Sequence, residues 1–303
     1  MPSTQSDALR DLMTRMTERT TANPAMGLPE LRDMVDGLST MAGEPTGVTY
    51  EEVVAGDRPA LWCNPVGAVD DRVVLYFHGG GFLGNSASSH RKLAAHLAKA
   101  AGIRALVVEF RLAPEHPFPA QLDDAVAAYG WLLDNGFEAG NIATAGDSAG
   151  GNLATGTVLR LRDEGRPVPA AIVAMSPWYD LEAAEGTLDT NAAKDAFLNR
   201  PLIQAMAGMY LGADGSPRDP LANPLRSDPT GLPPVYLSAG GDEGLLDNAQ
   251  RFAELARAAG VDVTLEVVPG MQHVHTTMAG RAPEADRTLA AIATWLRPLL
   301  GLG

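Results

Sequence analysis

The chain has 303 residues, of which 46% are hydrophobic and 20% are charged, and its formal net charge is -14 at pH 7. This length and composition predict an ordinary globular protein with one large domain and a small appendage. The strong negative charge repels phosphate backbones and anionic membrane surfaces, so it argues against nucleic-acid binding. Neutral or apolar ligands suit the chain better.

The N-terminus and the cysteine content bear on where the protein resides. The first 15 residues lack the basic region and the continuous apolar core of a signal peptide. No apolar run approaches the roughly 20 residues that a membrane span requires. The single cysteine, Cys63, cannot form an intramolecular disulfide, which fits a reducing compartment. We therefore expect a cytoplasmic protein without a membrane span.

The first predicted elements are helices in residues 1–45, because Leu9, Met13 and Met16 recur at helical spacing and Leu31 and Met34 follow the same pattern. Two runs, 48–55 and 60–63, flank a turn that contains Gly56-Asp57 and predict an antiparallel hairpin on a sheet edge. From there on, short β-branched runs alternate with longer helical patterns. The predicted strands are 73–77, 105–110, 142–145, 171–175, 235–237 and 263–268, and the predicted helices are 91–101, 122–133, 152–162, 246–259 and 285–296. This rhythm predicts an α/β fold with about eight strands, mostly parallel and flanked by helices.

Residues 181–232 interrupt the rhythm and contain one helical patch, 201–211. We expect this insertion and residues 1–45 to form a small helical cap over the carboxyl ends of the strands, where open parallel sheets bind ligands. Residues 46–180 and 233–303 then form the two parts of the core. Methionine adapts to irregular apolar shapes. The candidates for lining a substrate pocket are Phe82, Trp178, Met206, Met209 and Tyr210.

The sequence Gly146-Asp147-Ser148-Ala149-Gly150 lies between a predicted strand and a predicted helix, as a nucleophile elbow requires. A sharp turn there forces Ser148 into unfavourable backbone angles, and small neighbours relieve the crowding. The following helix N-terminus offers a positive field to a developing oxyanion. Asp147 is expected to brace neighbouring loops.

Three consecutive glycines follow the strand 73–77 in the turn His78-Gly79-Gly80-Gly81-Phe82. A glycine turn could instead bind phosphate, but this one lacks the lysine-serine ending of a P-loop and the spacing of a dinucleotide fingerprint. We expect its backbone to approach a substrate oxygen. The predicted oxyanion donors are the N–H groups of Gly80, Gly81 and Ala149.

A serine nucleophile needs a histidine base and a carboxylate that orients it. Of the six histidines, only His273 and His275 follow the last predicted strand, where this type of hydrolase places its base. We choose His273, with His275 as the alternative; a metal site at this pair lacks further ligands nearby. The acid is expected after strand 235–237, and we choose Asp242 over the adjacent Glu243 because it comes first. Asp247 is assigned a structural role at the start of the next helix.

These motifs, with the Gly270-Met271-Gln272-His273 loop, resemble the hormone-sensitive-lipase-like family of bacterial esterases over residues 73 to 300. The stretch 111–120 looks like that family's arginine-leucine-alanine-proline-glutamate loop, and Phe110 stands where the family frequently has tyrosine. The stretch 242–247 looks more like the branch with monoterpene ε-lactone hydrolases. The resemblance implies an α/β-hydrolase fold with a helical cap and the roles already named: Ser148 as nucleophile, His273 as base, Asp242 as acid.

The family resemblance implies hydrolysis of short- to medium-chain carboxylic esters through an acyl-enzyme, without cofactor or metal. The expected ligand is a small apolar ester, and a homodimer is left open. Lactone hydrolysis by the same groups is the alternative, and amidase or formamidase activity is a more distant one because a leaving amine must be protonated. Plant gibberellin receptors resemble this fold without the triad histidine, and the presence of His273 and Asp242 argues against such a binding module.

Overall fold

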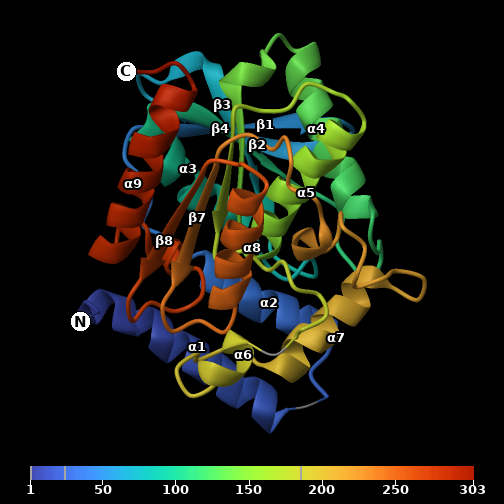
Figure 1. The fold of residues 1–303 in the computed structure, drawn as a ribbon. Coiled ribbons are helices and arrows are strands. Elements are labelled where there is room, and N and C mark those ends of the chain that lie inside the picture. Colours follow the sequence, from blue (N-terminus) through green and yellow to red (C-terminus); the bar gives the residue numbers. More distant parts are fainter. Residues whose placement is uncertain (1, 24, 185) are drawn as a thin grey trace.

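The computed structural model describes residues 2–23, 25–184 and 186–303, and its central feature is one eight-stranded sheet (Figure 1). The strand order is β1-β2-β4-β3-β5-β6-β7-β8. The strands are β1 (Val48–Ala55), β2 (Arg58–Pro65), β3 (Val69–Phe77), β4 (Ile103–Val108), β5 (Ile142–Asp147), β6 (Ala171–Met175), β7 (Val235–Gly240) and β8 (Val263–Val268). The helices of the core are α3 (Ala87–Ala101), α4 (Ala120–Asp134), α5 (Ala149–Asp163), α8 (Leu246–Ala258) and α9 (Pro283–Leu299), with short 3-10 turns η1 (Ala139–Asn141), η2 (Pro224–Arg226) and η3 (His275–Met278).

The pairing of the strands confirms the predicted sheet. β1 and β2 form the antiparallel edge hairpin, β2 pairs antiparallel with β4, and the strands β3 to β8 run parallel to one another. The predicted bounds of β1, β6 and β8 coincide with the observed ones, whereas β7 continues three residues past its predicted end at Leu237. The longer β7 matters below, because the acidic residues of the site follow it.

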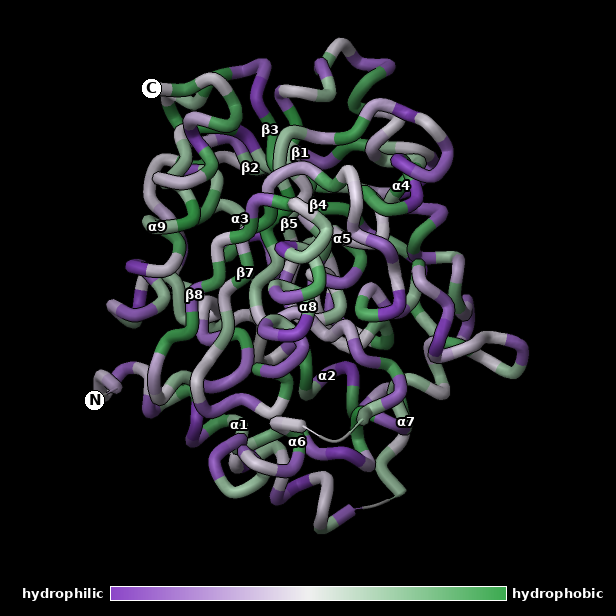
Figure 2. The backbone as a smooth tube through the Cα atoms, in the orientation of Figure 1, coloured by the Kyte–Doolittle hydropathy of each residue, from purple (hydrophilic) through white to green (hydrophobic). Residues whose placement is uncertain are grey.

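Alternate residues of β3 separate two layers of core. Val74 and Tyr76 pack with α3 and α9 on one face, and Leu75 and Phe77 pack with α4 and α5 on the other. Figure 1 shows α9 on one side of the sheet and α5 and α8 on the opposite side. Figure 2 shows hydrophobic residues concentrated in the central strands. Strands buried on both faces are typical of parallel sheets.

The remaining helices are α1 (Thr4–Ala22), α2 (Leu28–Ser39), α6 (Thr187–Thr190) and α7 (Arg200–Leu211), and they lie together at one end of the sheet (Figure 1). α1 buries Leu9, Met13 and Met16 against Met278 of the core. Burying each such side chain contributes roughly 1.5–3 kcal/mol. These apolar side chains of α1 therefore hold the N-terminal segment against the core.

Arg32 of α2 makes a second attachment of this segment. Its Nε donates to the Leu83 carbonyl at 2.6 Å, and its guanidinium also reaches the Ala113 carbonyl and Glu115. The division into a cap (residues 1–45 and 181–232) and a core remains our proposal, and its predictions for Met1, Pro24 and Glu185 fall outside the described residues. Across the described residues, no helix combines the length and apolarity that crossing a bilayer requires.

Candidate active site

Ser148 occupies a tight turn between β5 and α5. Its backbone angles are φ 53° and ψ -119°, a region that side-chain-bearing residues rarely adopt. A Cβ added to Gly146 would lie 2.3 Å from the Gly150 carbonyl carbon, and one added to Gly150 would lie 2.0 Å from the Phe77 carbonyl oxygen. Both glycines are therefore required by close backbone approach, and the turn directs Ser148 out of the end of the sheet.

His273 lies in the loop after β8, and its Nε2 is 2.9 Å from Ser148 Oγ. The residue is 5% exposed. This distance lies within hydrogen-bond reach, as a general base requires. The structure thus brings together two residues that are 125 positions apart in sequence.

The carboxylate beside His273 belongs to Glu243, and this corrects the expectation for Asp242. Glu243 Oε2 lies 3.6 Å from His273 Nδ1, and the Glu243 side chain is fully buried. Asp242 is half-buried, and its backbone N–H donates to the Met271 carbonyl. Within the described part of the chain, its side chain forms no ion pair with His273. Asp242 comes first out of β7, but the turn directs the next residue inward.

Two donors hold the Glu243 carboxylate in place. Ser176 Oγ donates to Glu243 Oε2 at 2.7 Å, and the Gly240 backbone N–H donates to the same oxygen at 3.2 Å. Ser176 Oγ also accepts from the Val274 N–H at 3.1 Å. Ser176 therefore links the acid to the histidine loop. Sequence reasoning missed Ser176 because it follows β6 without any motif that marks it.

The two histidines of the loop have different electrostatic surroundings. Burial is the largest single influence on the pKa of His273 and lowers it, but Glu243, with smaller contributions from Asp195 and Asp147, raises it, so the net pKa lies above the ordinary value. For His275, burial lowers the pKa to about 4, and its Nε2 lies 3.1 Å from Thr288 Oγ1. His275 therefore faces away from Ser148 and is not placed to act as the base.

The alternative for His273 and His275 is a pair of metal ligands. No cluster of three or more His, Cys, Asp or Glu suited to a metal ion occurs among the residues that the structure describes.

Asp247 lies in the first turn of α8, but its side chain does not cap that helix; it accepts from Thr187 Oγ1 at 2.7 Å. Asp247 thus joins α8 to the inserted segment.

The glycine turn after β3 takes the conformation that its composition predicts. Gly80 and Gly81 have φ of 107° and 64°. A Cβ on Gly80 would lie 2.4 Å from the Gly84 carbonyl oxygen. Within the described chain, no acceptor is recorded for the N–H groups of Gly80, Gly81 or Ala149. Backbone donors without an internal acceptor suit an oxyanion site.

Asp147 fastens this turn to the elbow, as expected. Its Oδ1 accepts from Tyr76 Oη at 2.7 Å and from the Gly79 N–H at 3.3 Å, and its Oδ2 lies 3.3 Å from His90 Nε2. His78 stacks on Phe110 with ring centroids 4.1 Å apart, and burial lowers the pKa of His78 to about 3. His78 is therefore neutral near pH 7 and stabilises the turn by packing.

The five candidate pocket residues separate into two groups. Phe82, Trp178 and Tyr210 are at most 1% exposed, and Phe82 stacks on Tyr210 with centroids 3.8 Å apart. These three aromatic residues form packed core behind the site, which corrects their assignment to the pocket. Met206 and Met209 are half-buried and line cavities.

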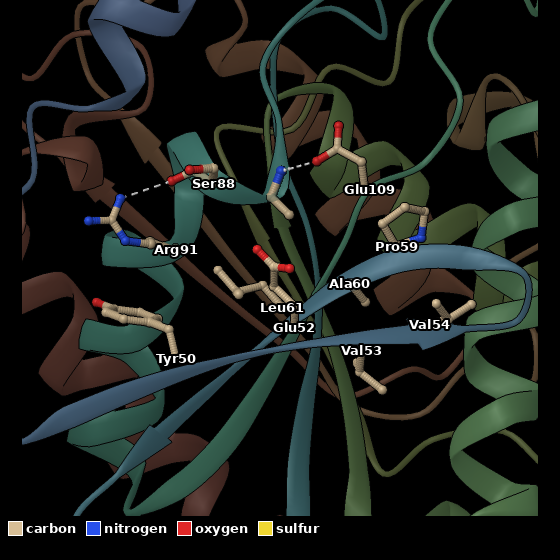
Figure 3. Close-up of a pocket in the computed structure, with 11 residues that line it drawn as sticks. Tyr50, Glu52, Val53, Val54, Pro59, Ala60, Leu61, Ser88, Arg91 and Glu109 are labelled. Carbon is tan, nitrogen blue, oxygen red and sulfur yellow. Dashed lines mark hydrogen bonds between the residues drawn. The ribbon is translucent and has the colours of Figure 1, made fainter.

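A cavity of about 70 Å³ lies directly over Ser148. Its walls include His273, Gly80, Gly81 and Met206. A larger hollow of about 710 Å³ lies between the β1–β2 hairpin and α3, lined by residues such as Arg91 and Glu109 (Figure 3). Volume does not decide which of these two cavities is the candidate active site. Of the two, the smaller one contains Ser148 and His273, whose side chains are in contact.

The comparisons with known proteins agree with this geometry. A family model described as the α/β-hydrolase fold matches residues 74–277. An acetyl-hydrolase of Streptomyces hygroscopicus is 41% identical over 261 residues, which is 86% of either chain. The carboxylesterase NlhH of Mycobacterium tuberculosis is 35% identical over 283 residues, 88% of this chain and 83% of that one.

Solved structures extend the similarity to nearly the whole chain. An esterase from the bacterial hormone-sensitive lipase (HSL) family has a TM-score of 0.93 and 39% identity, covering 99% of this chain and 100% of that one. EstE5, in a crystal soaked with p-nitrophenyl butyrate, has a TM-score of 0.90 and 32% identity, covering 99% of each chain. The chain therefore belongs to the α/β-hydrolase family, among its hormone-sensitive-lipase-like esterases, and is a carboxylic ester hydrolase.

Proposed function

We propose that the protein hydrolyses short- to medium-chain carboxylic esters through an acyl-enzyme, with Ser148 as nucleophile, His273 as base and Glu243 as orienting acid. The observation that carries the proposal is the 2.9 Å contact between Ser148 Oγ and His273 Nε2 at the mouth of a small cavity. A serine hydroxyl is a weak nucleophile near neutral pH, so it needs a base at this distance.

In the first half-reaction, Ser148 Oγ attacks the ester carbonyl carbon while His273 Nε2 takes the hydroxyl proton. The carbonyl oxygen becomes an oxyanion that the N–H groups of Gly80, Gly81 and Ala149 stabilise. When the tetrahedral intermediate collapses, the carbon–oxygen bond to the alcohol breaks and His273 gives its proton to the leaving oxygen. The product is an ester of Ser148.

In the second half-reaction, His273 takes a proton from water, and the resulting hydroxide attacks the acyl carbon. The oxyanion forms again at the same donors, and His273 returns its proton to Ser148 Oγ as the carboxylic acid leaves. Glu243 keeps the imidazole in the required tautomer and stabilises the imidazolium through both steps. This is the role that the sequence assigned to Asp242.

The substrate range is supported by the relatives and by the cavity. One relative is named an acetyl-hydrolase, and one similar structure was soaked with p-nitrophenyl butyrate. A cavity of about 70 Å³ suits small acyl groups better than long ones. Lactone hydrolysis, amidase or formamidase activity, the homodimer and the cytoplasmic location remain predictions from sequence.

The test is turnover of p-nitrophenyl acetate and butyrate by Ser148→Ala. We expect kcat to fall by about four orders of magnitude or more, because the nucleophile is gone, while circular dichroism shows an unchanged fold. Substantial retained turnover would remove Ser148 from the mechanism.

The matched pair His273→Ala and His275→Ala tests the base. The first change should be nearly as severe as Ser148→Ala, and the second should cost less than about tenfold, since His275 contacts Thr288 rather than the serine. The opposite ranking would move the base to His275.

A further inference from the structure

Two small apolar chambers meet at one methionine of α7. The front chamber, defined by Ser148, His273 and Gly81, is the catalytic cavity described above. The rear chamber has the same volume, about 70 Å³, and lies between α2, α7 and the glycine turn. Side chains that line only the rear chamber include Leu28, Leu31, Met34, Leu83, Leu202 and Met209.

The shared wall between the chambers consists of Val35, Gly80, Phe197 and Met206, because these four residues line both. Gly80 contributes only backbone. A Cβ added to Gly81 would lie 2.6 Å from the Met206 sulfur, so the thioether packs directly on the backbone of the glycine turn. Met206 is unbranched and only half-buried, which makes it the most adaptable part of the wall.

The chemistry of the rear chamber favours a hydrocarbon chain. Most of its lining is apolar, and Thr20 and Arg32 are the residues with polar side chains among those that line it. The Arg32 guanidinium is bound to the Leu83 carbonyl, the Ala113 carbonyl and Glu115, so its donors are directed away from the chamber. A buried alkyl chain gains free energy by leaving water, and it has no polar atoms to satisfy.

We infer that Met206 is a partition that sets the length of alkyl chain the active site accepts, and that the rear chamber receives the end of a longer chain when this side chain is shortened or swings aside. The inference rests on the proposed function and deepens it. It explains how a pocket of small volume serves both short and medium chains. The chain could be the acyl half or the alcohol half of the ester, and the two substrate series below distinguish these.

The test is Met206→Ala with p-nitrophenyl esters from acetate to octanoate and with alkyl acetates from ethyl to octyl. In one of the two series, we expect the ratio of kcat/KM for the eight-carbon chain to that for the two-carbon chain to rise by about tenfold. This is what burying one to two further methylene groups contributes. The series that responds identifies the half of the ester that enters the rear chamber.

Two further variants make the test specific to the partition. Gln204→Ala changes an exposed residue of α7 that lines neither chamber, so the ratio should stay near the wild-type value. Leu31→Trp fills the rear chamber, so in the Met206→Ala background it should remove the gain. An unchanged ratio for Met206→Ala in both series, or a gain that survives Leu31→Trp, would overturn the inference.

The failure of the partition and the failure of the proposed function give different results. If Met206 is no partition, wild-type protein still hydrolyses p-nitrophenyl acetate in a Ser148-dependent manner and only the chain-length ratios stay flat. If the proposed function is wrong, no ester of either series is turned over in a Ser148-dependent manner. Thermal unfolding of each variant separates a folding defect from both.

Discussion

The floor and the roof of the active site are built from different kinds of contact. The floor consists of backbone turns at strand ends, where Gly146 and Gly150 approach neighbouring main chain so closely that no side chain fits. The roof consists of helices attached by side chains, such as Arg32 on the Leu83 carbonyl and Met206 on Gly81. We propose that the main-chain turns of the floor position the catalytic side chains, and that side chains of the roof determine the substrate range.

The largest expected effect within the floor concerns the acid. Glu243→Gln should lower kcat by about 10³- to 10⁴-fold, because the imidazole loses its orienting charge, whereas Asp242→Asn should cost less than about threefold. Steady-state kinetics with p-nitrophenyl butyrate checks both. If Asp242→Asn were the more damaging change, the contact between Glu243 and His273 would not be the functional one.

The pH dependence sharpens the same comparison. A general base works in its neutral form, so activity rises as pH passes upward through the pKa of His273. Because the net pKa of His273 lies above its ordinary value of 6.5, with Glu243 as the main group that raises it, the acidic limb of wild-type kcat/KM should lie above pH 6.5. Removing the charge in Glu243→Gln should move that limb to lower pH, and Asp242→Asn should leave it in place.

A smaller effect is expected at Ser176, which is buried and donates a hydrogen bond to Glu243. Both Ser176→Ala and Ser176→Gly remove the hydroxyl, and each should lower kcat by about tenfold with little change in KM. The pair is matched because Ser176 has φ of 46°, which glycine adopts without strain and alanine does not. Full activity in Ser176→Gly would show that backbone strain, and not the hydroxyl, is what matters there.

The smallest effect is expected in the roof. Arg32→Ala removes the contacts to two carbonyls and to Glu115 and should lower the free energy of unfolding by about 1 kcal/mol, since partly exposed ion pairs add little. kcat for p-nitrophenyl acetate should change by less than about threefold. Limited proteolysis should cut α1 and α2 faster than in an Arg15→Ala control, whose side chain is exposed on α1. Equal cleavage in the two variants would argue against Arg32 as an attachment.

The sequence predicted the sheet, its edge hairpin and the positions of Ser148 and His273, because each follows a strand or turn with a strong local pattern. It did not distinguish Asp242 from Glu243. Two neighbouring carboxylates on a turn point in different directions, and which one points inward depends on where β7 ends. β7 ends at Gly240, three residues beyond the predicted end, because its last residues pair with β8. The residues at the end of β7 carry no sequence pattern that predicts this pairing.

The prediction that three aromatic residues line the substrate pocket was wrong for a related reason. Phe82, Trp178 and Tyr210 flank the right motifs, yet their rings pack on one another rather than on the cavity. Proximity in sequence predicts which element carries a side chain, but not whether that side chain lines the cavity or packs in the core behind it. Met206 and Tyr210 share one face of α7. Met206 packs on Gly81 beside the cavity, whereas Tyr210 stacks on Phe82 in the core.

The close approach of Gly150 to the Phe77 carbonyl has an evolutionary consequence. Phe77 leads into the glycine turn and Gly150 lies two residues after Ser148, so the two parts of the proposed catalytic site are in contact through main-chain atoms. A substitution at Gly150 would break this main-chain contact, because no side chain fits there, so the contact cannot change in small steps. Proteins that descend from such a chain can change their substrate range through substitutions in the helices over the site. The main-chain turns that position the reacting groups stay the same.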